Sequence, residues 1–263
     1  MKNQGVTRRL SLAIVSLVDS DCAAHLGKAE RLLRSIEETS FGEWNLETFL
    51  CVRGEKMASL DSTQNAVVFR INVESPIHRP TAKYLVSRAQ DWGAFDLVCL
   101  LDVDTLVLRD FSSFLSPGSF HVKPADVETV PAALIARVLQ KFSSGSPGFE
   151  VRTTVSGIVI PMYFNSGVIV TPGRSANQVF EDLHKESLMI HAYLRKEEGV
   201  VGTFADQLAI SVLAARGQLP PIELLDNRCN FPIHLLRFDI ESDVAIVHYH
   251  DEKHLTGGLR KFQ

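Results

Sequence analysis

The chain has 263 residues, of which 45% are hydrophobic and 22% are charged, and its formal net charge is −4 at pH 7. This composition is typical of a globular protein and excludes an intrinsically disordered chain. The slightly acidic balance, without a broad basic surface, argues against a nucleic-acid partner.

The first third of the chain alternates between segments typical of strands and of helices. An apolar run predicts a buried strand at residues 10–17, and the apolar stripe that follows predicts a helix at 22–38. We expect further strands at 48–52, 67–71 and 96–101. Pro80 is expected to open a helix that runs to about residue 92, because a proline is tolerated in the first helical turn.

The N-terminal segment allows two interpretations. Arg8 and Arg9 followed by an apolar run imitate a signal peptide. We favour a first strand, because the run is short and Asp19 and Asp21 follow it without a convincing cleavage site. No run reaches the roughly 18 to 20 apolar residues of a membrane span. The four cysteines form no C-x-x-C pair, so a cytoplasmic protein with Cys51 and Cys99 as reduced, buried side chains is expected.

The rest of the chain continues the alternation. We expect a helix at 131–141, a loop at 141–148, a long helix capped by Ser175 that ends before Gly199, a helix at 204–216 stopped by Gly217, and a late strand at 243–248. This order predicts an α/β fold with a mainly parallel sheet flanked by helices, in a single domain covering residues 1–263. In such sheets ligands bind at the carboxyl ends of the strands.

Three polar segments follow or interrupt apolar runs. Asp102 and Asp104 come directly after one run, and their oxygens suit Mg²⁺ or Mn²⁺ bridging to a diphosphate, although an acidic turn would give the same pattern. Asn165, Ser166 and Gly167 stand between two apolar stretches, where a sugar-binding segment and a simple β-bulge are equally compatible with the sequence.

The third segment contains His248 and His250 at the end of the late strand. A neutral imidazole can join two carboxylates on a manganese ion, whereas the alternative is a pair of surface histidines.

Four motifs occur in a definite order: D-x-D at 102–104, F-N-S-G at 164–167, D-Q at 206–207 and H-Y at 248–249. This order resembles glycosyltransferase family 8, the glycogenin-like and bacterial galactosyltransferase-like enzymes, over about residues 10 to 255. Residues 19–26 also resemble the first nucleotide loop and helix of that family. The resemblance implies a GT-A fold, a divalent metal (Mn²⁺ or Mg²⁺) and retaining transfer from a UDP-sugar. It also implies a nucleotide-binding half at about 10–110 and an acceptor and sugar half at about 150–255.

The resemblance also implies roles for individual residues. The metal would be held by Asp102, Asp104 and His248. The catalytic sugar and acceptor pocket would contain Asn165, Asp206 and Gln207. The nucleotide-sugar donor would contact Ser16, Asp19, Asp21, Lys83, Arg88, Asp102, Val103, Asp104, Ser166, Gly167 and Lys253, with Lys83 and Arg88 as alternatives for one contact to the phosphate or sugar.

The tail of the chain departs from the family pattern. The family usually places a Lys-Pro-Trp after its late histidine, whereas residues 251–258 here are DEKHLTGG, so Lys253 is expected to reach the diphosphate in its place. Neither the donor sugar, the acceptor (a saccharide, a lipid-linked glycan, a protein or a small molecule) nor the oligomeric state is indicated. A diphosphate leaving group needs cations rather than a general acid, which fits these residue types.

Two other functions share some of these features. A haloacid-dehalogenase-type phosphatase also places D-x-D after an apolar strand, but it normally has a threonine where Leu106 stands here. A non-catalytic nucleotide- or carbohydrate-binding protein on the same fold would explain the pocket without requiring D-x-D, D-Q and histidine together.

Overall fold

A central sheet of seven strands organises the molecule, and its strand order is β10-β6-β9-β4-β1-β2-β3. The computed structural model describes residues 8–42, 44–54, 65–72, 79–143, 148–199, 204–239 and 242–262. Its strands are β1 (Ser11–Asp19), β2 (Asn45–Arg53), β3 (Ala66–Ile71), β4 (Leu97–Leu101), β6 (Phe120–Pro124), β9 (Phe164–Pro172) and β10 (Ile222–Leu224). Strand β9 pairs antiparallel with β6 and β4, and the other pairs are parallel. The expected mainly parallel α/β sheet is therefore confirmed.

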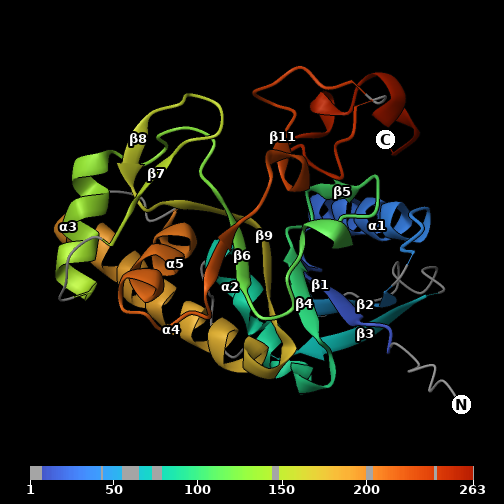
Figure 1. Ribbon diagram of the computed structural model, residues 1–263, viewed down its shortest axis with the longest axis horizontal. Coiled ribbons are helices and arrows are strands. Elements are labelled where there is room, and N and C mark those ends of the chain that lie inside the picture. Colours follow the sequence, from blue (N-terminus) through green and yellow to red (C-terminus); the bar gives the residue numbers. More distant parts are fainter. Residues whose placement is uncertain are drawn as a thin grey trace, which may run out of the picture.

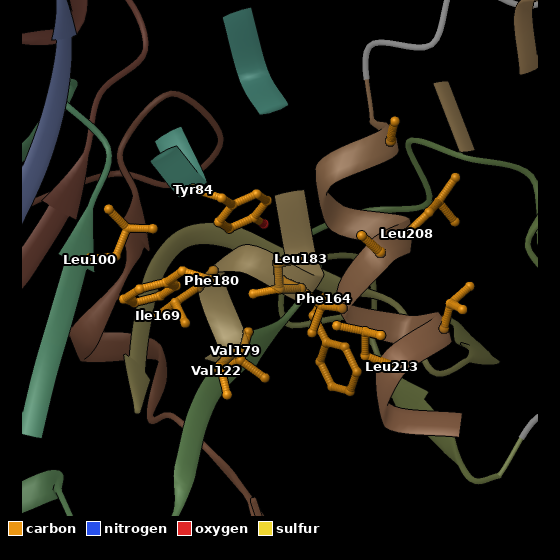
Figure 2. Packing of buried hydrophobic residues seen from close by; sticks show 14 of the residues in the cluster. Tyr84, Leu100, Val122, Phe164, Ile169, Val179, Phe180, Leu183, Leu208 and Leu213 are labelled. Carbon is orange, nitrogen blue, oxygen red and sulfur yellow. The ribbon is translucent and has the colours of Figure 1, made fainter. Parts of the chain in front are cut away.

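Both faces of this sheet are covered, because alternate residues of its inner strands enter two different apolar clusters. Val15 and Leu100 belong to the cluster that includes residues of α3 (Ala132–Ser143), α4 (Gly173–Glu197) and α5 (Ala205–Ala215). Ile14 and Cys99, one position away, belong to the cluster that includes residues of α1 (Ala23–Glu37). Figure 1 shows α4 and α5 lying together, far from α1. Figure 2 shows Phe180 and Leu183 of α4 beside Ile169 of β9.

A small second sheet carries the C-terminal part of the chain. It has the order β11-β12-β5, formed by β11 (Phe231–Pro232), β12 (Ile246–His248) and β5 (Thr105–Val107). Strand β12 is antiparallel to β5 and parallel to β11. A third apolar cluster, which includes Leu106, Tyr249 and Phe262, packs this sheet against the terminal segment beside α1 (Figure 1). The hairpin of β7 (Glu150–Arg152) and β8 (Val159–Pro161) forms a separate two-stranded sheet.

The expected strands at 10–17, 48–52, 67–71 and 96–101 correspond to β1, β2, β3 and β4. The expected helices at 22–38, 131–141 and 204–216 correspond to α1, α3 and α5. The loop expected at 141–148 lies partly outside the described residues. The long helix α4 begins at Gly173 rather than after Ser175, whose hydroxyl donates to the Pro172 carbonyl (3.0 Å) instead of capping the helix. The late strand expected at 243–248 is limited to Ile246–His248.

The single helix expected at 80–92 is wrong. The segment consists of α2 (Arg79–Ala82), a 3₁₀ helix η1 (Lys83–Arg88) and a 3₁₀ turn η2 (Trp92–Ala94). The second half of the segment is held by Asn177 of α4, whose amide donates to the carbonyls of Ser87 and Gln90 (both 2.7 Å) and accepts from the Trp92 backbone NH (2.9 Å). These tertiary hydrogen bonds satisfy backbone groups that would otherwise need a continuous helix.

The four cysteines are free, and Cys51 and Cys99 are buried in β2 and β4 as expected. Among the described residues, no helix combines the length and the apolar character that crossing a bilayer would need.

Candidate active site

A pocket of about 420 Å³ lies at one edge of the central sheet, within the usual size range of small-ligand sites. Its lining includes residues that follow the carboxyl ends of parallel strands: Asp19 of β1, Arg53 of β2, Asp102 after β4 and Asp126 after β6. Ligands are expected at this edge of a mainly parallel sheet. The described residues of α1, α5 and the C-terminal segment also contribute to the lining, through Lys28, Gln207 and His248 among others.

The Asn165–Gly167 segment reaches this edge for a different reason from the one expected. It does not end a parallel strand but begins β9, whose direction is reversed. The first residues of an antiparallel strand lie beside the last residues of its neighbours. Accordingly, the backbone NH of Asp102 donates to the Gly167 carbonyl at 2.9 Å. The expectation of three ends of parallel strands is therefore corrected in two cases, since β12 also belongs to the separate sheet.

Lys83 connects two carboxylates at the base of the pocket. Its Nζ lies 2.9 Å from Asp102 Oδ1 and 3.0 Å from Asp206 Oδ2, and it donates to Ser166 Oγ at 2.9 Å. The Ser166 hydroxyl in turn donates to Asp206 Oδ2 at 2.6 Å. Burial alone would lower the pKa of Lys83, but the carboxylates of Asp102 and Asp206 raise it above its ordinary value. Lys83 is therefore a permanent ammonium between the two acids.

Asp104 faces the histidines of the C-terminal segment. Its Oδ1 lies 3.2 Å from His248 Nε2, its Oδ2 lies 3.7 Å from His250 Nδ1, and Lys28 Nζ is 3.3 Å from the same Oδ2. The register of β12 against β5 sets this contact, because His248 pairs with Thr105. Burial favours the neutral form of Asp104, but His248, His250 and Lys28 together outweigh it and hold the pKa of this carboxyl well below its usual range.

A divalent metal fits this second group. One ligand atom each from Asp104, His248 and His250 lie within 4.8 Å of one another, and carboxylate oxygen with imidazole nitrogen suits a divalent transition metal. The structure thus brings together Asp104 and His248 of the expected ligand set. Asp102 is held by Lys83 through both carboxylate oxygens, at 2.9 and 3.1 Å. Burial is the main reason why the pKa of Asp102 is raised.

A chain of amide side chains links this group to the opposite wall of the pocket. Asn230 donates to Asn165 Oδ1 (3.1 Å), and its own Oδ1 lies 3.2 Å from His248 Nδ1. Asn165 donates to Asp126 Oδ2 at 2.9 Å. Asp126 is in turn paired with the fully buried Lys123. These bonds fix the orientation of each member, so that Asn165 and His248 cannot turn independently.

The other residues named from the sequence are divided between the pocket and its surroundings. Asp19, Val103, Asn165, Ser166, Asp206 and Gln207 line the pocket. Ser16 is buried and donates to the Leu101 carbonyl (2.7 Å), whereas Asp21 is exposed. Arg88 pairs with Glu181 (3.6 Å) and Lys253 with Asp251 (3.1 Å). Neither Arg88 nor Lys253 is among the described residues that line the pocket, so the structure places Lys83 there and not Arg88.

Several lining residues were not singled out from the sequence: His25, Lys28, Arg53, Asp126 and His234. One of them had a usable signal, because Lys28 lies in the first helix after the first strand. Strand β6, which precedes Asp126, was not predicted because His121 and Lys123 interrupt its apolar pattern, although both are buried.

No known family model matches the chain, and no curated protein matches it by sequence. Solved structures do match. An active-site mutant of LgtC is similar with a TM-score of 0.58 at 15% identity, covering 95% of this chain and 93% of that one. The galactosyltransferase LgtC in complex with donor and acceptor sugar analogs has a TM-score of 0.56 at 17% identity, with the same coverage of both chains. The glycosyltransferase GlyE of Streptococcus pneumoniae TIGR4 has a TM-score of 0.57 at 16% identity, and the match covers 92% of this chain and 55% of GlyE. The chain therefore has the GT-A-like fold of these structures, which confirms the fold that the resemblance implied.

Proposed function

We propose that the protein is a glycosyltransferase that moves a hexose from a nucleoside diphosphate sugar, in the first place a UDP-sugar, to an acceptor. One observation carries the proposal. Asp102, Asp104, Lys83, Asp206 and His248 meet in a single pocket of about 420 Å³ at the ligand-binding edge of the sheet. The similar structure of LgtC holds donor and acceptor sugar analogs, which supports this reading of the fold.

The nucleoside is assigned to the end of the pocket formed by β1 and β2. Asp19 is buried at the end of β1, and the Arg53 guanidinium lies 3.4 Å from its Oδ2. Asp19 offers acceptor oxygens and Arg53 offers donors, which together can satisfy a base or a ribose. Val103, between the two aspartates, supplies an apolar contact at the same end of the pocket.

The diphosphate is assigned to the centre of the pocket. A divalent ion, Mn²⁺ or Mg²⁺, bound by Asp104 and His248 would supply positive charge to the departing diphosphate. Lys28 offers a further positive charge, because it lines the pocket and its side chain is only 16% exposed. Lys253, which was expected in this role, is 70% exposed and paired with Asp251. We therefore assign the second cation to Lys28.

The sugar is assigned to the side of Asn165, Asp206 and Gln207. Asp206 stands in the first turn of α5, is 4% exposed, and is held by Lys83 and Ser166. Both partners bind the same oxygen, Oδ2, which lies 3.0 Å from Lys83 Nζ and accepts from Ser166 at 2.6 Å. We therefore assign Asp206 a positioning role and not that of the base that an inverting enzyme needs, and we propose transfer with retention.

The stereochemistry has a direct measurement. An NMR time course of the first-formed product should show an α-linked sugar from an α-linked donor, and a β-linked product would contradict retention. Gln207→Ala should lower turnover more than donor affinity, because a contact made in the transition state affects kcat. A collapse of donor affinity with turnover preserved would make Gln207 a binding residue only.

The proposed function is tested by UDP-sugar consumption with Mn²⁺. A transferase should hydrolyse the donor slowly without acceptor and stop when EDTA is added. Asp104→Ala should lower the rate by at least about 100-fold, the scale of losing a charge-stabilising group. Asp182→Ala on α4, outside the pocket, is the control. Full activity in Asp104→Ala would contradict the assignment of Asp104 to the metal. If the unaltered protein binds the UDP-sugar without consuming it, the protein is a non-catalytic binding protein.

A further inference from the structure

Four histidines of the C-terminal segment lie close together beside Asp104. The rings of His248 and His250 are 4.0 Å apart, those of His234 and His250 are 4.1 Å apart, and that of His254 is 6.0 Å from His234. A site for a hard ion such as Mg²⁺ would be dominated by oxygen ligands and water. The described residues that could hold an ion here are Asp104, His248 and His250, which is one carboxylate and two imidazoles.

We propose that the ion site is histidine-rich, with His250 as a third ligand beside Asp104 and His248 and His234 as a neighbouring fourth, so that it selects a transition-metal ion over Mg²⁺. The inference rests on the proposed function only because the ion site lies in the same pocket. It states which ion binds and which side chains hold it, and the measurement is ion affinity and not sugar transfer.

The charges around Asp104 support this preference. Lys28 lies 3.3 Å from Asp104 Oδ2, and Asp102 is neutralised by Lys83 at 2.9 Å. The site therefore offers little net negative charge to attract a cation. Binding then depends on the donor atoms, and imidazole nitrogen favours later transition metals such as Co²⁺, Ni²⁺ and Zn²⁺, while carboxylate and water favour Mg²⁺.

The backbone of His250 gives a second, independent indication. His250 has φ 54°, in the left-handed region, and no other described non-glycine residue has a positive φ. This conformation is unfavourable for a non-glycine residue and persists only where the surroundings impose it. Lys28 donates to the His250 carbonyl at 2.6 Å, and the neighbouring Tyr249 NH donates to the Asp104 carbonyl at 3.0 Å. The strained residue thereby directs its Nδ1 toward Asp104.

The remaining two rings are oriented for the same purpose. Because Asn230 donates its amide to Asn165, its Oδ1 is left to accept from His248 Nδ1, and Nε2, 3.2 Å from Asp104 Oδ1, is the ring nitrogen left for an ion. His234 Nδ1 is buried without a hydrogen-bond partner in the part of the chain that the structure describes. A buried nitrogen without a partner is unfavourable, and a bound ion would supply one.

The test is calorimetric titration of the metal-free full chain with Co²⁺ and with Mg²⁺, together with the visible absorption of bound Co²⁺. We expect Co²⁺ to bind at least about tenfold more tightly than Mg²⁺. His250→Gly should lower Co²⁺ affinity at least about tenfold and change Mg²⁺ affinity less than about threefold. Glycine suits the positive φ, so this variant is expected to fold.

Two further variants complete the test. His234→Ala should lower Co²⁺ affinity at least about threefold, and unchanged affinity would overturn its place as fourth ligand. His254→Ala is the matched control from the same segment, since its Nδ1 contacts the Tyr249 carbonyl at 2.7 Å, and its Co²⁺ affinity should equal that of the unaltered protein.

Equal affinity for Co²⁺ and Mg²⁺, or an unchanged Co²⁺ spectrum and affinity in His250→Gly, would overturn the inference. Its failure is distinguishable from that of the proposed function. Selective Co²⁺ binding without any sugar transfer would reject only the transferase, whereas Mn²⁺-dependent transfer with no role for His250 in ion binding would reject only the histidine-rich site.

Discussion

Lys83 is the residue on which the arrangement of acidic groups in the pocket depends. It is buried at the start of η1 and contacts Asp102, Asp206 and Ser166 at 2.9 to 3.1 Å. Without its ammonium group, two carboxylates would share a buried space with no opposite charge. Such a space disfavours ionisation of both acids. Lys83 therefore serves the stability of the fold as well as the ligand site.

Replacement of Lys83 by methionine should lower the free energy of unfolding by about 3–5 kcal/mol, the usual loss when one partner of a buried ion pair is removed. Arg88→Met is the matched control from the same 3₁₀ helix. Arg88 is 50% exposed and 3.6 Å from Glu181, so its loss should cost less than about 1 kcal/mol. Urea denaturation at neutral pH measures both values. Equal effects of the two substitutions would show that the Lys83 network adds no stability.

Strand β9 is the element that joins the two halves of the site. It lies between β6 and β4 and runs against both, so its first residues reach the edge where the other strands end. At Gly167 it passes so close to β12 that a Cβ would lie 2.6 Å from His248 Cε1 and 2.7 Å from Nδ1. The absence of a side chain at this position lets the two sheets approach each other.

Gly167→Ala should therefore lower the free energy of unfolding by about 1–3 kcal/mol, because His248 is 4% exposed and its ring contacts Asn230 and Asp104, both at 3.2 Å, which a displacement would break. Displacement of its ring should also weaken Co²⁺ binding. Gly118→Ala is the control, since a Cβ there meets nothing within 4 Å, and it should change stability by less than about 0.5 kcal/mol. Thermal unfolding with and without Co²⁺ gives both quantities. A Gly167→Ala protein with normal stability and metal affinity would contradict the close packing.

Across the whole molecule, β1 holds the sheet together. It pairs in parallel with β4 on one side and β2 on the other, and its residues enter the apolar clusters on both faces. Its last residue, Asp19, also lines the pocket. Loss of β1 would expose the inner edges of two strands and open both clusters at once.

Deletion of residues 1–20 should accordingly abolish cooperative folding, since the remaining strands cannot close the gap that β1 leaves. Far-UV circular dichroism and a denaturant titration, compared with the full chain, measure the effect. The result also bears on the interpretation of the N-terminus. A soluble, cooperatively folded chain beginning after residue 20 would mean that the basic and apolar start of the sequence acts as a signal peptide.

The sequence by itself determined the local elements and the types of residue at the site. Apolar runs predicted β1 and β4, and the carboxylates placed directly after β4 indicated an ion and a diphosphate before any tertiary contact was known. These features follow from neighbouring residues, whose spacing fixes which side of a strand or helix is buried. The order of short polar motifs then indicated the fold that the similarity to LgtC confirms.

Only the tertiary structure decided how these pieces meet. The direction of β9, the hydrogen bonds of Asn177 to the segment 79–94, and the place of Lys28 beside Asp104 depend on contacts between distant residues. Asp104 and His248, for example, are 144 residues apart in the chain. Such contacts form because the packing of the whole molecule repays the entropy of closing long loops, and no local pattern records that balance. For that reason the sequence could indicate the residue types of the site, whereas their partners followed only from the fold.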